Sequence, residues 1–115
     1  RLGVPKVLGP YSEGFGTVKP SRVNNGGDPT GLFWNITWDS WGGPIARGHG
    51  NAYWEPPDAL VADSYSQPAE FAAYGLATCE GKPTYRHLAV WFPTHGGQFD
   101  PSTNGEASYD LCHRL

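Results

Sequence analysis

The 115-residue chain lacks the features that would place it in a bilayer or on nucleic acid. Its apolar runs fall well short of the roughly 18 residues that a membrane-spanning helix needs, and no charged segment followed by an apolar core marks a signal peptide. Lysine and arginine number 8 against 11 acidic residues, and they form no cluster. Because phosphate binding needs clustered positive charge, we expect no nucleic-acid partner and no transmembrane segment.

The common catalytic and metal-binding motifs are missing as well. No Gly-x-Ser-x-Gly elbow is present for a serine nucleophile, and the 4 histidines form no His-x-His or His-x-x-x-His pair for zinc. The turn over residues 24–31 offers oxygen ligands, Asp28 among them, but its spacing does not match an EF-hand loop. We therefore predict no metal, no cofactor and no catalytic residue, and we favour a protein that is not an enzyme.

Glycine and aromatic residues dominate what is present. Only 38% of the residues are apolar, yet 14% are aromatic, with 5 tryptophans, 16 glycines and 11 prolines. Large aromatic side chains must then supply much of the core, and the glycines and prolines indicate many turns between short strands. The four glycines and two prolines of residues 1–16 exclude a helix there. We predict an extended N-terminal arm over residues 1–16 and a single β domain over residues 17–115.

The strongest strand pattern lies in residues 31–54. Apolar and polar residues alternate over residues 32–38, with Trp34 and Trp38 on the same face, which is typical of a strand with one buried side. Gly42 and Gly43 can then supply a tight reversal, and residues 45–54 alternate again. We predict a β-hairpin.

One face of the returning strand is almost bare backbone, because Gly48 and Gly50 fall on it. A strand of this kind is usually covered by something bulky, and the tryptophans of the hairpin are the nearest candidates. Trp34, Trp38 and Trp91 are accordingly interpreted as aromatic core. The alternative is that some of the tryptophans face a ligand.

Further strands are predicted over residues 17–23, 69–79, 84–93 and 109–115, and a long polar loop over residues 94–108. Six to eight short antiparallel strands joined by Gly/Pro-rich turns build an all-β fold. We expect a small antiparallel β-sandwich or barrel.

The chain has 2 cysteines, Cys79 and Cys112, and they lack the close spacing of a zinc or redox motif. We predict a disulfide that ties the C-terminal tail to the body of the domain; two unrelated buried thiols are the alternative. By loop entropy such a bridge would add about 3 to 4 kcal/mol to the free energy of unfolding. A disulfide would also indicate an oxidising compartment.

Four residues are candidates for ligand binding. Trp41, Tyr53 and Trp54 lie near the ends of the predicted hairpin, where aromatic rings can stack on a sugar. His95 lies on a loop next to two glycines, where it can meet a ligand or stabilise the turn. Asn35 begins an Asn-Ile-Thr glycosylation sequon, but it lies inside the strongest predicted strand.

Three segments together resemble a family of small exported proteins and lipoproteins of actinobacteria: W-D-S-W-G-G-P-I-A-R-G-H-G, L-A-T-C-E-G-K-P-T-Y and W-F-P-T-H-G-G-Q-F-D-P. The resemblance runs from about Gly14 to Pro101, and the chain departs from it at Ala77, where a glycine is expected. That family has no assigned activity. The resemblance implies export and a disulfide-bridged β fold, and it adds no catalytic residue.

We therefore expect a secreted or cell-surface β domain, the mature part of an exported precursor, that binds a protein or a cell-envelope component without catalysis. A carbohydrate-binding module that uses Trp41, Tyr53 and Trp54 is the first alternative. A small hydrolase or metal-dependent enzyme built on His95 and an acidic residue is the second. The sequence leaves the ligand and the oligomeric state open.

Overall fold

The computed structural model describes residues 1–27, 31–56, 65–99 and 110–114. These residues form five β-strands and one short 3-10 helix. The elements are β1 (Val23–Asn24), β2 (Leu32–Trp38), β3 (Ile45–Trp54), β4 (Tyr65–Cys79), β5 (Lys82–Trp91) and η3 (Pro93–His95). The predicted all-β class is confirmed.

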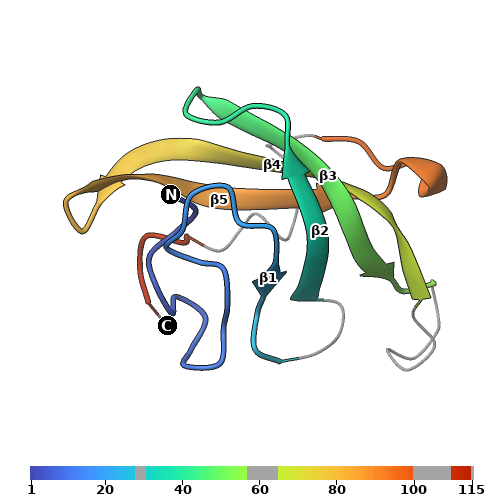
Figure 1. The fold of residues 1–115 in the computed structure, drawn as a ribbon, viewed down its shortest axis with the longest axis horizontal. Coiled ribbons are helices and arrows are strands. Elements are labelled where there is room, and N and C mark those ends of the chain that lie inside the picture. The colour runs from blue at the N-terminus through green and yellow to red at the C-terminus, as the bar shows by residue number, and fades with distance from the viewer. Residues whose placement is uncertain (28–30, 57–64, 100–109, 115) are drawn as a thin grey trace.

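The strands form one sheet in the order β1-β2-β3-β4-β5, and each pairs antiparallel with its neighbour along the chain. The sheet curls into a half-barrel, with the terminal segments lying together beside it (Figure 1). Six to eight strands were expected, and the described part of the chain has five. The difference arises near the C-terminus, where the described residues 110–114 form a turn.

Strand β2 contains an irregularity that inverts part of its predicted pattern. Asn35 adopts a left-handed φ of 54°, and the pairing with β3 shifts between Trp34 and Thr37. The extra residue of such a bulge moves the side chains before it to the opposite face. Trp34 consequently belongs to neither buried cluster, and Phe33 packs on the main core in its place. The prediction that Trp34 is core was wrong for this reason.

The prediction for the bare face of β3 is confirmed. A Cβ atom on Gly48 would lie 2.8 Å from the carbonyl oxygen of Thr37 and 3.0 Å from a ring carbon of Trp38. On Gly50 it would lie 2.7 Å from the carbonyl oxygen of Trp34. Glycine is therefore required at Gly48, where the backbone of the neighbouring β2 and the Trp38 indole come this close, and at Gly50, where the β2 backbone does.

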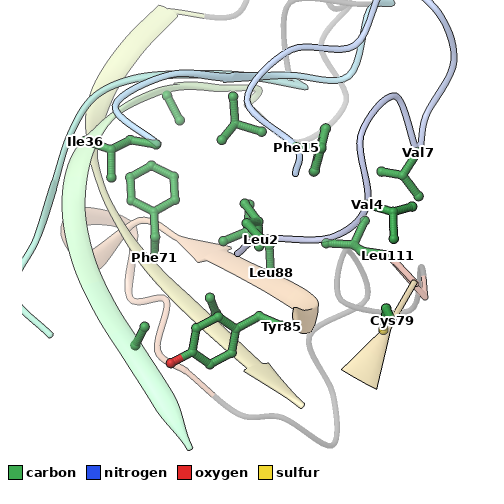
Figure 2. Close-up of a cluster of buried hydrophobic side chains, with 14 of the residues drawn as sticks. Leu2, Val4, Val7, Phe15, Ile36, Phe71, Cys79, Tyr85, Leu88 and Leu111 are labelled. Atoms are coloured by element: carbon green, nitrogen blue, oxygen red, sulfur yellow. The ribbon is translucent and has the colours of Figure 1, made fainter. Parts of the chain in front are cut away.

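The N-terminal segment, residues 1–16, packs against the sheet. It contributes four buried apolar side chains, which face those of the strands across the core (Figure 2): Leu2, Val4, Val7 and Phe15. Leu2 pairs with Tyr85 of β5 in an isolated parallel bridge. The core is therefore closed on one side by a segment that has no regular secondary structure.

One predicted strand is shortened, and another is not formed by the described residues. Within residues 17–23 only Val23 belongs to a strand, since β1 is limited to Val23–Asn24. The described residues 110–114 form a turn, although Leu111 within it is buried. Pro20 interrupts the first of these segments, because proline has no N–H to donate to a sheet.

The disulfide between Cys79 and Cys112 is confirmed, with the two Cα atoms 5.5 Å apart. A second tie lies beside it, since the guanidinium group of Arg86 donates hydrogen bonds of 2.6 and 3.1 Å to the carboxylate of Asp110. These donated hydrogen bonds lower the pKa of Asp110 to about 2, and the backbone N–H of Cys112 adds to the effect. The C-terminal turn is thus attached to both β4 and β5.

Some expectations concern residues that lie outside the described ranges. They are the turn around Asp28, for which no metal is predicted, and most of the polar loop, residues 100–108. Within the described ranges no helix is long and apolar enough to cross a membrane.

Candidate functional site

An open cavity of about 500 Å³ lies between the sheet of the half-barrel and the N-terminal segment. That volume lies within the range of about 300 to 1,000 Å³ that is typical of small-molecule sites. Its apolar walls come from the N-terminal segment, β1, β2, β5, the residue after β5, and the C-terminal turn. They are Leu8, Phe15, Val23, Phe33, Leu88, Val90, Phe92 and Leu111. The cavity is therefore an open pocket with largely apolar walls.

The residues that give this pocket its polar character gather at one end of the sheet. We call them the polar mouth: Asn25, Tyr53, Trp54 and Glu55. They share this end because β1 finishes there, β2 begins there and β3 finishes there. The N–H of Asn25 donates to the carbonyl oxygen of Gly31 at 2.9 Å, and Phe33 pairs with Ala52 just inside the mouth.

His95 reinforces the mouth. Its ring stacks on the indole of Trp54, with centroids 3.6 Å apart and an interplanar angle of 4°. Tyr65 meets the same indole edge-on at 5.7 Å. The helix η3 ends at His95, so the chain that leaves the wall residue Phe92 returns directly to the mouth. One face of Trp54 is thereby covered by protein.

Trp41, the fourth candidate residue, lies elsewhere. It follows β2 at the hairpin turn, which is at the opposite end of β3 from Trp54. Its ring contacts Trp38 at 4.9 Å and Tyr85 at 5.1 Å, both edge-on. The hydroxyl of Tyr85 accepts a hydrogen bond from the N–H of Gly42 at 2.8 Å, which holds this turn on the core. The fold thus stacks Trp54 on His95, while Tyr53 packs on Trp34 with ring centroids 5.0 Å apart and Trp41 lies at the other end of β3.

A second aromatic cluster covers the outer face of β4 and β5. Trp91 is buried there beneath Phe99, with the two rings nearly parallel at 5.5 Å. Tyr74 meets Phe99 at 5.3 Å, and the guanidinium carbon of Arg47 lies 5.2 Å from the centre of the Phe99 ring. Burial raises the pKa of Tyr74. The predicted core role of Trp91 is confirmed, although in a cluster separate from the main core.

One group of possible metal ligands occurs among the described residues, formed by Asp110, Cys112 and His113. The sulfur of Cys112 is bonded to Cys79 and is therefore not a thiolate ligand. The carboxylate of Asp110 is bound by Arg86. This cluster consequently serves to hold the C-terminal turn.

Sequence reasoning missed most of the pocket. Leu8 and Phe15 belong to a segment that was expected to be an extended arm, and Leu111 to a segment that was expected to be a strand. The composition of residues 1–16 could have indicated that this segment packs on the domain, because it has too many aliphatic side chains for an arm that is exposed to water. Glu55 gave no signal, since a single glutamate after a strand is common.

Comparisons with protein-family models, curated proteins and solved structures find no match to this chain. Only the chain's own residues therefore indicate a function. Within the described part of the chain, the pocket is the feature that best fits a ligand.

Proposed function

We propose that this protein is a secreted or cell-surface binding domain that holds an apolar part of a cell-envelope component in its half-barrel pocket. The observation that carries the proposal is the cavity of about 500 Å³, with apolar walls and polar residues at one end. Moving apolar ligand surface from water into such a pocket is favourable by roughly 25 cal/mol per Å².

The pocket walls support binding because they are largely fixed in advance. Val23, Leu88 and Leu111 are buried, and the disulfide holds the turn that carries Leu111. A wall that is already ordered loses little conformational entropy when a ligand binds.

Location outside the cytoplasm has two supports. The disulfide between Cys79 and Cys112 persists in an oxidising compartment. The resemblance to small exported proteins of actinobacteria points in the same direction. A cell-envelope component is therefore the partner class that we propose.

The carbohydrate-binding alternative is less well supported by the geometry. A sugar platform needs neighbouring aromatic faces that are open to the ligand, but Trp41 lies at the far end of β3 from Trp54. His95 covers one face of Trp54. The pocket therefore makes the stronger case.

The test is retention of fractionated envelope material by the purified, immobilised domain. Lipid, protein and glycan fractions are applied to the wild type, to Val90→Phe, which fills the pocket, and to Leu76→Phe. Leu76 is exposed and does not line the cavity, so that variant adds the same ring outside it. We expect one fraction to be retained by the wild type and by Leu76→Phe, and at least tenfold less by Val90→Phe when circular dichroism shows it folded. Equal retention by all three proteins, or by none, would contradict the proposal.

A further inference from the structure

We infer that the pocket takes an amphiphile with one aliphatic chain and a head group that is positively charged or donates hydrogen bonds. The inference rests on the proposed function, because it names the ligand class of the same pocket. It follows from the separation of polar and apolar residues along the cavity.

The inner walls set the nature of the tail. Eight of the lining residues are aliphatic or phenylalanine side chains, and they are the apolar wall residues named above. None of these side chains can hydrogen-bond, so a polar group pushed among them would lose its water without replacement. The part of the ligand that lies there must be hydrocarbon.

The size of the cavity limits the ligand to one chain. About 500 Å³ is in the lower half of the range for small-molecule sites. The N-terminal segment occupies the rest of the concave side with its own buried side chains. A lipid with two full chains would have to displace that segment.

The polar mouth sets the head group. Glu55 is exposed, and it is the only charged residue among the described residues that line the cavity. A carboxylate accepts hydrogen bonds and attracts a cation, and it repels another carboxylate. Asn25 lines the same end of the cavity, and its side-chain oxygen accepts a hydrogen bond from the N–H of Gly27 at 2.8 Å, so its amide N–H₂ is the neutral polar group beside Glu55. An amine or a hydrogen-bond-donating head therefore fits this mouth better than a fatty-acid carboxylate does.

The experiment is isothermal titration calorimetry of the full chain with alkylamines and alkanoates below their critical micelle concentrations. At pH 7 and low salt, we expect dodecylamine to bind about two- to fivefold more tightly than dodecanoate, which is the effect of one solvent-exposed charge pair. In Glu55→Gln the two affinities should become equal. Affinity should rise about fourfold for each methylene added from octylamine upwards, and level off once the chain exceeds the pocket.

The same variants as before show where the amphiphile binds. Val90→Phe should weaken dodecylamine binding at least tenfold, and Leu76→Phe should leave it unchanged. Tighter binding of dodecanoate, a preference that survives in Glu55→Gln, or equal binding by Val90→Phe would overturn the assignment. So would an absence of saturable binding. If amphiphiles fail while an envelope fraction is still retained through Val90, the ligand class is wrong and the proposed function stands. If both fail, neither stands.

Discussion

The strands and the terminal segments of this molecule are buried alike but held in different ways. Phe71 on β4 and Leu2 near the N-terminus are both fully buried, at 0% exposure. Phe71 belongs to a strand paired with neighbours on both sides. Leu2 lies in a segment of turns that has only two isolated β-bridges, at Leu2 and at Glu13. Burial in this fold therefore does not depend on regular secondary structure.

The backbone groups of the terminal segments form separate hydrogen bonds with different partners, and not the regular ladder of a sheet. The N–H of Leu2 donates to the carbonyl oxygen of Thr17, and the N–H of Val4 to that of Leu111, each at 2.9 Å. The guanidinium group of Arg1 donates to the carbonyl oxygen of Cys79 at 2.7 Å. A buried group without such a partner would cost free energy, and no repeating ladder supplies substitutes here. A few contacts therefore decide whether these segments stay on the sheet.

The comparison is tested most directly by truncating one side chain in each region. Leu2→Ala should lower the free energy of unfolding by about 2 to 5 kcal/mol and Phe71→Ala by about 3 to 5 kcal/mol, because each leaves a cavity in the same core. Urea denaturation measures both. A loss below about 1 kcal/mol for Leu2→Ala alone would show that the N-terminal segment is not part of the cooperative core.

Removal of the disulfide weakens the C-terminal attachment specifically. The bridge closes a loop with a sequence separation of 33. The paired replacement Cys79→Ser with Cys112→Ser should therefore lower the free energy of unfolding by about 3 to 4 kcal/mol. Wild-type protein treated with a reductant is the matched comparison, and it should show the same loss. If the replaced protein were as stable as the oxidised wild type, the turn over residues 110–114 would be held by its other contacts.

The sheet was predictable from sequence because its signals are local. Alternation over residues 45–54 and 69–79 depends only on the period of a strand, and the glycines at Gly48 and Gly50 show where something crosses closely. Trp34 was misplaced because the bulge at Asn35 depends on a left-handed φ that asparagine adopts in some contexts and not in others. One extra residue was enough to reverse the face on which the side chain lies.

The pocket was not predictable, because its walls meet only through long-range packing. Leu8 and Leu111 lie at opposite ends of the chain, and neither follows a repeating pattern. Tyr53, Trp54 and His95 were selected for their chemistry and their proximity to turns, and the fold brings Trp54 and His95 into contact. Irregular segments have no hydrophobic periodicity, so their sequence does not predict which residues they pack against.

The close approach of the paired strands β2 and β3 supplies a prediction within the sheet. Gly48→Ala should lower the free energy of unfolding by about 1 to 3 kcal/mol, since the new methyl group would meet the Thr37 carbonyl oxygen and the Trp38 ring. Gly43→Ala in the adjoining turn is the control, because no atom lies within 4 Å of a Cβ there. Thermal unfolding followed by circular dichroism compares them. Equal midpoints would mean that β2 can move away from β3 at no cost.

The smallest expected effect concerns the ion pair that attaches the C-terminal turn. Asp110 has a pKa of about 2 in the folded protein against 3.8 for an ordinary aspartate, chiefly because Arg86 donates hydrogen bonds to its carboxylate. A lowered folded-state pKa stabilises the protein above about pH 4, and that stability is lost as the pH falls towards 2. Both side chains are partly exposed, so solvent screening reduces the contribution to about 1 kcal/mol.

Asp110→Asn keeps the shape of the side chain and removes its titration. The free energy of unfolding, measured by urea denaturation between pH 5 and pH 2, should therefore fall less steeply in the variant than in the wild type. Part of the slope should remain, because Glu80 also has a lowered pKa through its hydrogen bonds from Arg114. Arg86→Gln should flatten the curve somewhat less than Asp110→Asn does, because Asp110 then still titrates and keeps its hydrogen bond from the N–H of Cys112. A curve for Arg86→Gln as steep as that of the wild type would show that Arg86 does not lower the pKa of Asp110.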